Sequence, residues 1–335
     1  PRTLESLRPL GVTDAILSRG DTTPSAELHL GRRTVSVRLA ELDIPDTPFP
    51  HLTMVRQMDV ENVLLDALHE AGVSVEWGSD LVDVTAYDDH VSCAVLGATR
   101  TEPAEARYGV GCGGAASTIR ELAGIGWRGG AYREEIVLAD LEVEGLAPGR
   151  LHVVAAKEGL LFLFALGEQG SWRLLATRPR GEAEQPFGQT GERVPDSVVR
   201  DLVGGAGLGV VTAVQWSSVV RLQHRLADAF GVGRLFLAGD AAHAHSPAAA
   251  QGMNTGILDA VNLGWKLAFA ARRPGPHVDA LLGSYEQERR PVARQVLALT
   301  HLVFFAEAST NPLPAFLRGT VLPFVAPVVP MVLRR

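Results

Sequence analysis

One stretch of this chain combines a carboxylate, a run of small residues and the expected start of a helix. Residues 234–267 read RLFLAGDAAHAHSPAAAQGMNTGILDAVNLGWKL. The apolar run 235–238 has the length of a strand, and it ends at Gly239 and Asp240. N–H groups in such a turn and at a helix N-terminus attract an anionic or electron-rich group. A carboxylate at the carboxyl end of a strand accepts hydrogen bonds from sugar hydroxyls. The pattern therefore favours a site for a polyol joined to a flat heterocycle.

The helix that follows this turn is predicted from the spacing of its apolar and small residues. After Gly252 they recur at close to helical spacing, at Ile257, Val261, Leu263, Gly264 and Leu267. Asp259 and Lys266 fall outside this stripe, so we expect both of them on the other, free face of the helix.

The composite pattern resembles the GD motif of the FAD-dependent aromatic and polyketide hydroxylases, the p-hydroxybenzoate-hydroxylase-like flavoprotein monooxygenases. The match comprises GDAAH, a proline, QGMNTG and DAVNLGWKL, so it is far more specific than a lone glycine motif. The resemblance implies six cofactor-binding residues: Gly239, Asp240, Pro247, Gly252, Met253 and Asn254. Asp240 would bind the ribityl chain of FAD, and the backbone of residues 252–254 would meet the pyrimidine edge of the flavin. Pro247 would lie beside the ring where oxygen reacts.

The chemistry implied by this resemblance belongs to the flavin, while the protein positions it and excludes water. NAD(P)H would reduce FAD, and the reduced flavin with O2 would hydroxylate an electron-rich aromatic or polyketide substrate. His243 and His245 lie near the expected ring and are candidate catalytic residues, as a proton relay or a polar wall. The alternative is that each histidine hydrogen-bonds its own loop. The sequence shows no nucleophile elbow and no ligand spacing typical of a metal site.

A second stretch, residues 108–125 (YGVGCGGAASTIRELAGI), resembles the second flavin motif of the same family, GCDGA-x-S-x-R. Gly113 occupies the position of the family aspartate and Ala116 that of an arginine. The loss of the aspartate removes a charged hydrogen-bond partner, and such a bond contributes about 1.5–3 kcal/mol. Arg120 remains as a candidate phosphate ligand, with a solvated helix arginine as the alternative. Gln57 precedes a predicted helix and, by resemblance, contacts FAD; the alternative is a solvated loop glutamine.

Other positions near the expected cofactor also depart from the family pattern. Ala249 and Ala250 replace two glycines of Pro-x-Gly-Gly-Gln-Gly. If either position requires a positive φ, alanine costs about 1–2 kcal/mol there. The family's first βαβ unit, with its GxGxxG loop, is not found before Pro1. These departures leave open an alternative function, a non-catalytic or FAD-deficient fragment or pseudoenzyme on the same scaffold.

The expected fold is a mixture of α/β and α+β. It comprises an N-terminally truncated, Rossmann-like FAD-binding core, an inserted antiparallel β-sheet substrate domain and C-terminal helices. The expected boundaries are 1–130 and 226–300 for the FAD-binding domain, 131–225 for the substrate domain and 301–335 for a helical tail. Strand-like runs separated by turns predict the substrate sheet, at residues 136–143, 151–156, 160–166, 172–177 and 210–222.

Spacing and turn residues predict the remaining elements. A short helix capped by Thr3 should bury Leu4 and Leu7, and Asp59 should cap a second helix. Residues 284–291 resemble the family's Y-E-x-E-R-x-P element, which is mainly structural. The other predictions are a hairpin at 26–30 and 34–39, strands at 73–77, 81–87, 91–96 and 107–112, and helices at 117–123, 195–204 and 278–305.

Composition excludes several classes of protein. The 335 residues are 46% hydrophobic, and the net charge of −7 with no basic block argues against a nucleic-acid partner. Cys93 and Cys112 are too few for a disulfide framework, which favours a reducing, cytoplasmic setting. The apolar stretch 321–333 is interrupted by prolines and shorter than the ~20 residues of a membrane span, so no stable membrane insertion is expected. Substrate identity, NADH against NADPH and oligomeric state are not specified by the sequence.

Overall fold

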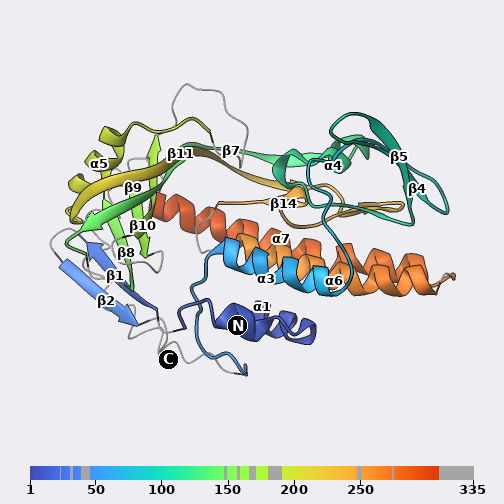
Figure 1. The fold of residues 1–335 in the computed structure, drawn as a ribbon, viewed down its shortest axis with the longest axis horizontal. Coiled ribbons are helices and arrows are strands. Elements are labelled where there is room, and N and C mark those ends of the chain that lie inside the picture. Colours follow the sequence, from blue (N-terminus) through green and yellow to red (C-terminus); the bar gives the residue numbers. More distant parts are fainter. Residues whose placement is uncertain are drawn as a thin grey trace. The chain divides into compact units, whose positions relative to one another are not determined.

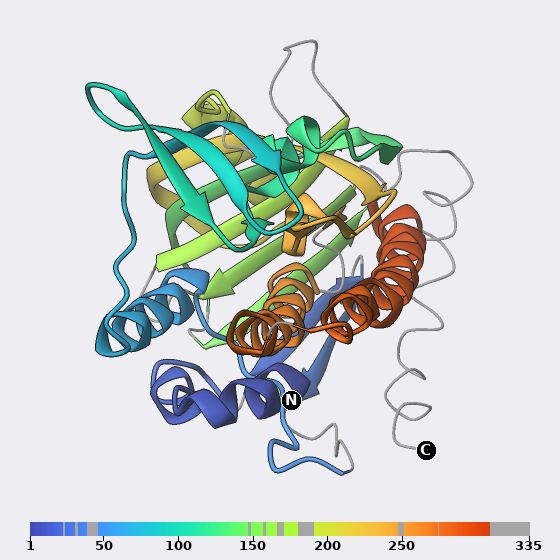
Figure 2. The same ribbon diagram turned by 90° about the vertical axis from the view of Figure 1, so that its right-hand side faces the viewer.

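The computed structural model describes residues 1–22, 24–30, 33–38, 46–146, 149–156, 159–165, 171–179, 191–246, 251–273 and 275–308. Its contacts divide the chain into two compact units (Figures 1 and 2). The first, here called the sheet unit, contains Pro1–Leu65, Tyr132–Leu222 and the described residues from Val303 onward. The second, here called the motif unit, contains Asp66–Ala131 and Gln223–Leu302. Residues 1–65 thus group with the large sheet, whereas the boundaries expected from sequence placed them with the FAD-binding residues.

The sheet unit is built around strands in the order β11-β7-β10-β9-β8-β1-β2, and an eighth strand, β14, continues the sheet in the motif unit. β7 to β10, β10 to β9 and β9 to β8 pair antiparallel, whereas β8 and β1 pair in parallel. The bounds are β1 Ser25–Leu30, β2 Arg33–Arg38, β7 Trp127–Glu144, β8 Arg150–Ala156, β9 Gly159–Ala165, β10 Ser171–Pro179, β11 Val210–Ala227 and β14 His243–Ala244. β7 and β11 are long enough to run through both units.

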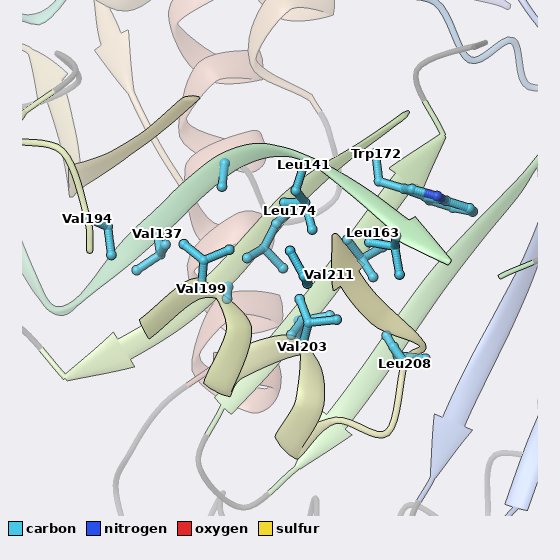
Figure 3. Packing of buried hydrophobic residues seen from close by; sticks show 14 of the residues in the cluster. Val137, Leu141, Leu163, Trp172, Leu174, Val194, Val199, Val203, Leu208 and Val211 are labelled. Carbon is cyan, nitrogen blue, oxygen red and sulfur yellow. The ribbon is translucent and has the colours of Figure 1, made fainter. Parts of the chain in front are cut away.

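A single apolar cluster holds helix α5 (Asp196–Gly205) against this sheet (Figure 3). Val199 and Val203, one helical turn apart, are both fully buried and face the strands. On β10 the alternate residues Trp172 and Leu174 point into the same cluster and are almost completely buried. Side chains two residues apart on the strand and four residues apart on the helix therefore pack together in one core.

The other helices of the sheet unit lie near the N-terminus: α1 (Arg2–Leu7), the 3-10 turn η1 (Arg8–Leu10), α2 (Thr13–Leu17) and the start of α3 (Gln57–Glu70). Leu4 and Leu7 are buried as predicted. The capping predictions were wrong, because Pro1 precedes α1 while Thr3 lies inside it, and Asp59 lies in the first turn of α3.

Among its described residues, the motif unit contains two three-stranded sheets, three helices and the last residues of α3. One sheet is an antiparallel meander, and the other pairs β12 with β13 antiparallel and β13 with β6 in parallel. The elements are β3 Asp80–Ala86, β4 Val91–Leu96, β5 Thr101–Ala106, β6 Gly109–Gly111, η3 Gly114–Ala116, α4 Thr118–Leu122, β12 Gly231–Val232, β13 Leu235–Leu237, η4 Gly239–Ala241, α6 Gly252–Arg272 and α7 Val278–Ala308. α7 extends past this unit.

The structure confirms the mixed α/β fold with a large sheet and C-terminal helices, together with the predicted hairpin, the strands at 81–87 and 91–96 and the helices. The strand predicted at 73–77 is wrong, because these residues form no strand pairing and Trp77 is 79% exposed. No helix in the described part of the chain is long and apolar enough to cross a membrane. The apolar stretch 321–333 lies outside the described residues.

Candidate functional site

Two parallel strands bring both sequence motifs to one edge of a sheet in the motif unit. Leu237 at the end of β13 pairs with Gly111 at the end of β6. The backbone N–H of Ala238 then donates to the Gly111 carbonyl at 3.1 Å. The chain turns soon after each of these strands, and the two turns, η3 and η4, lie in contact. This is the carboxyl edge of parallel strands, where α/β proteins bind ligands.

The GD turn begins at a glycine in the left-handed region and lies against helix α6. Gly239 has a φ of +61°, in the left-handed region that favours glycine. A Cβ added at Gly239 would lie 3.6 Å from the Cα of Gly256 in α6. The turn leaves Asp240 exposed at the carboxyl end of β13. Its carboxylate is therefore available to accept hydrogen bonds from a ligand that lies along this edge.

The N-terminus of α6 adds backbone donors to the motif unit. Gly252, Met253 and Asn254 form its first turn, where N–H groups have no acceptor within the helix. That turn carries no acidic residue, and Gln251 before it makes no side-chain cap. The positive end of the helix dipole is therefore not neutralised by these residues. Pro247, Ala249 and Ala250 lie outside the described residues, so their predicted positions beside the flavin stay predictions.

Asp259 is a site residue that the sequence reasoning missed. It was expected on the free face of α6, but it is fully buried. Its Oδ2 accepts hydrogen bonds from the Gly239 backbone N–H at 3.1 Å and from His243 Nε2 at 2.6 Å. Its Oδ1 accepts one from Arg289 Nε at 2.7 Å. Asp259 thus fastens the GD turn to α6 and α7. Its place in the DAVNLGWKL stretch was the available signal.

Two opposing effects set the protonation of Asp259. Burial raises the pKa of this carboxyl, whereas the hydrogen bonds and charges of His243 and Arg289 lower it. The net effect is a pKa below the ordinary value, so the buried carboxyl is an anion at neutral pH. A buried charge of this kind persists only when it is paired, as it is here.

Lys266 was also expected on the free face of α6, and this was wrong. It is fully buried, and its Nζ lies 2.9 Å from Glu288 Oε2 on α7. Glu288 also accepts a hydrogen bond from Asn262 Nδ2 at 2.7 Å. The polar residues between the apolar positions of α6 therefore face α7. Packing against a second helix is the physical reason for both errors.

The two candidate histidines behave differently. His243 is fully buried and is linked to Asp259, so the alternative that it bonds its own loop is wrong for this residue. His245 does bond its own loop, because its Nδ1 donates to the Ser246 carbonyl at 3.0 Å. The rings lie nearly parallel with centroids 6.1 Å apart. Burial lowers the pKa of His245, which favours a neutral ring whose Nε2 is a proton acceptor.

Arg120 connects the two turns. It is buried, so the alternative of a solvated helix arginine is wrong. Its guanidinium donates to the carbonyls of Ala241 at 3.1 Å and Ala115 at 2.5 Å, and it lies over the Trp127 ring at 4.1 Å. Ser117 caps α4 by accepting from the backbone N–H of Arg120. The guanidinium thus holds η3 and η4 together, and its predicted contact with phosphate stays a prediction.

Gln57 belongs to the sheet unit, where it is the first residue of α3. It is exposed, and its Nε2 donates to Glu61 Oε1 at 2.8 Å. It is therefore a helix residue and not the loop glutamine considered as an alternative. The predicted contact of Gln57 with FAD stays a prediction.

The departure at Gly113 leaves room in the motif unit. Gly113 has a φ of −74°, and a Cβ added to it would meet no atom within 4 Å. A Cβ at this position therefore causes neither backbone strain nor collision. Ala116 lies close by in η3. The backbone geometry therefore does not explain why a glycine stands here in place of the family's aspartate.

The YEQERRP motif on α7 forms hydrogen bonds to the residues of this edge. Tyr285 Oη donates to the Leu237 carbonyl at 2.7 Å, and Glu286 accepts from the Phe230 backbone N–H at 3.0 Å. Arg289 bonds Asp259. These contacts agree with the mainly structural role expected from the sequence.

A parallel-strand edge with a glycine turn, a carboxylate at the strand end and an uncapped helix N-terminus defines an α/β protein that binds a nucleotide-type cofactor. The comparison with protein families gives the particular family. The model described as "FAD binding domain" matches residues 1–300, and the chain belongs to this family.

The chain is also similar to several proteins of known name. The chain is 34% identical over 338 residues to 6-methylpretetramide 4-monooxygenase of Streptomyces rimosus, covering 99% of this chain and 58% of that protein. It is 37% identical over 315 residues to a flavin-dependent monooxygenase of Mycobacteroides abscessus, covering 90% and 64%. The chain thus spans about three fifths of the length of these relatives.

Solved structures of hydroxylases have a fold similar to that of this chain. OxyS anhydrotetracycline hydroxylase from Streptomyces rimosus superposes with a TM-score of 0.75 at 29% identity, over 99% of this chain and 64% of that one. Aklavinone-11 hydroxylase, solved in a ternary complex with FAD and aklavinone, gives 0.77 at 25% identity, over 92% and 61%.

Proposed function

We propose that this chain forms the FAD-binding part of a flavoprotein monooxygenase that hydroxylates an aromatic or polyketide substrate. NAD(P)H would supply the electrons and O2 the oxygen atom, and we place this reaction in the cytoplasm. The observation that carries the proposal is the edge formed by β6 and β13. Asp240, the GD turn and the first turn of α6 all belong to the motif unit, and the family model covers them.

The residues at this edge fit FAD. Asp240 is exposed and accepts hydrogen bonds, which suits the hydroxyl groups of a ribityl chain. The backbone N–H groups of Gly252, Met253 and Asn254 suit the carbonyl oxygens of a flavin ring. When bound, the flavin accepts electrons from NAD(P)H and activates O2.

The other side chains support this arrangement. Asp259 fixes Gly239 and His243, and Arg120 fixes the carbonyls of Ala115 and Ala241. Such buried hydrogen bonds keep a turn in one geometry and so reduce the ordering that ligand binding would otherwise require. In our proposal His245, with a neutral ring, accepts a proton close to the site of reaction.

The first test is FAD binding by the purified chain, followed by absorption and flavin fluorescence. We expect reconstitution to a yellow protein, and we expect Asp240→Ala to weaken FAD binding about 10–100-fold, since a hydrogen bond to a charged group contributes about 1.5–3 kcal/mol. The matched control is Asp66→Ala, which removes an exposed carboxylate of α3. Colourless protein that excess FAD does not reconstitute would favour the pseudoenzyme alternative, and unchanged affinity in Asp240→Ala would refute the role of this residue.

The second test concerns the reaction. Relatives are named as 6-methylpretetramide 4-monooxygenase, anhydrotetracycline hydroxylase and aklavinone-11 hydroxylase, so aromatic polyketides are the first substrates to try. We expect such a compound to accelerate NAD(P)H oxidation and to gain one atom from labelled O2. Cofactor oxidation that yields hydrogen peroxide alone with every aromatic compound tried would contradict the hydroxylase assignment while leaving FAD binding intact.

A further inference from the structure

Three side chains that are typical metal ligands converge in the sheet unit. Glu27 and His29 alternate on β1 and therefore share one face, and His152 on β8 is the register partner of Glu27. His29 Nε2 lies 3.1 Å from His152 Nδ1, and Glu27 Oε2 lies 3.4 Å from that Nδ1 and 3.9 Å from His29 Nε2. No local sequence pattern indicates this group, because 123 residues separate its two histidines.

These separations match the edges of a zinc coordination tetrahedron. With metal–ligand distances of about 2.0–2.1 Å, tetrahedral ligand atoms lie roughly 3.3 Å apart. The three observed distances, 3.1, 3.4 and 3.9 Å, bracket that value. One ion can therefore contact all three atoms after small shifts, the largest being a closure of about 0.6 Å between Glu27 Oε2 and His29 Nε2.

The surroundings orient the ligands as supporting residues do in metal sites. The second ring nitrogen of His29 lies 3.4 Å from Thr34 Oγ1 on the adjacent strand β2. Arg150 donates to the other carboxylate oxygen of Glu27, which leaves Oε2 directed at the histidines. His152 is buried against Trp172, with ring centroids 5.4 Å apart, so its ring position is set by packing.

We propose that Glu27, His29 and His152 bind one divalent transition-metal ion of the zinc type. Two imidazoles and one carboxylate suit Zn2+, Co2+, Ni2+ or Cu2+ better than Mg2+ or Ca2+, which require oxygen ligands. Three protein ligands leave one coordination position for water. The ion would link β1 to β8 across the parallel junction of the sheet, and so fasten the β1–β2 hairpin.

The test is titration of tag-free, metal-stripped protein with Co2+, whose visible ligand-field bands report four-coordinate binding, followed by displacement with Zn2+. We expect one equivalent to bind. We expect His29→Gln and Glu27→Gln each to weaken binding by on the order of 100-fold, at or beyond the loss typical of a supporting residue. Thermal unfolding should shift upward with Zn2+ in the wild type but not in these two variants, since a ligand of the folded state stabilises it.

His90→Gln is the matched control, because His90 contacts Asp89 in the motif unit and should leave the Co2+ affinity unchanged. Circular dichroism establishes that each variant folds; if one does not, the other ligand variant decides. Wild type that binds no more Co2+ than His29→Gln, or affinities within about 3-fold across all variants, would overturn the proposal and identify adventitious binding only. Because the titration needs no FAD, its outcome is independent of the proposed function.

Discussion

Asp259 shows how a single buried residue can hold a binding edge in place. Three donors from α6's neighbours, namely the GD turn, β14 and α7, converge on one carboxylate. Each donor would be left without its charged partner if the carboxylate were lost. The geometry of the turn that carries Asp240 therefore depends on a residue that need not touch the ligand.

Asp259→Asn should lower the free energy of unfolding by about 3–5 kcal/mol at neutral pH, the cost of breaking a buried charge pair. The folded pKa of Asp259 is below the unfolded value of about 3.9. Its contribution is thus present above about pH 4 and is lost as the pH falls through the folded pKa. Urea unfolding from pH 7 down to pH 3 should show the wild type and the variant converging in acid.

The control for this series is Asp66→Asn, an exposed carboxylate whose replacement should change stability by less than about 0.5 kcal/mol. A difference between wild type and Asp259→Asn that stays constant from pH 7 to pH 3 would contradict the assigned ionisation. It would point instead to lost packing as the cause of destabilisation.

Gly113→Asp should tighten FAD binding. The position has open space and an ordinary φ, so an aspartate is accommodated without backbone strain. The family pattern places an aspartate there, and a new hydrogen bond from FAD to a charged acceptor contributes about 1.5–3 kcal/mol, or roughly 10–100-fold in affinity. Fluorescence titration of the variant measures the change. Gly124→Asp cannot serve as the control, because Gly124 has a φ of +65° and a side chain there would strain the backbone. Gly113→Asn is therefore the uncharged comparison.

At the scale of elements, α6 lies against the GD turn where two glycines, Gly239 and Gly256, face each other. A Cβ at Gly256 would lie 3.4 Å from the Gly239 Cα, whereas a Cβ at Gly264 on the same helix would meet nothing within 4 Å. Gly256→Val should therefore push α6 from the GD turn and destabilise by about 1–3 kcal/mol. Gly264→Ala should instead stabilise the helix by up to about 1 kcal/mol.

Thermal unfolding and FAD titration of these two variants separate helix propensity from packing. We expect weaker FAD binding in Gly256→Val and unchanged binding in Gly264→Ala. Equal FAD affinity in both variants would mean that the contact between α6 and the turn does not shape the binding edge.

The elements predicted correctly are those whose signal is local. The period of two in β10 and the turn between β3 and β4 each lie within a short window. β5 was missed because TEPAEA is polar and contains Pro103, which is tolerated on an edge strand. The parallel pairing of β1 with β8 joins residues more than 120 positions apart, so no local pattern predicts it.

The candidate site divides in the same way. The turn at Gly239 and the start of α6 at Gly252 follow from the motif and its spacing. The burial of Asp259 and Lys266 does not, because their partners Arg289 and Glu288 lie on α7, 30 and 22 positions further along the chain. A charged residue is expected at the surface unless its partner is known. Tertiary pairing therefore decided the positions that sequence periodicity could not.

At the scale of the whole molecule, two strands link the units. β7 and β11 each contribute residues to both the sheet unit and the motif unit. If either unit unfolded by itself, the pairing of these two strands in the other unit would be disrupted. We therefore expect the two units to unfold as one cooperative system, even though the proposed FAD site belongs to the motif unit.

Native-state hydrogen exchange tests this expectation. FAD at about 100 times its dissociation constant should lower the population of the globally unfolded state by roughly 100-fold. Amides that exchange only through that state should then exchange about 100-fold more slowly. If the units unfold together, the slowest amides of β10, in the core around Trp172 and Leu174, should slow by that factor although they belong to the sheet unit. Asp240→Ala at the same FAD concentration should show a smaller effect. Slowing confined to β13 and α6, with β10 unchanged, would mean that the motif unit opens on its own.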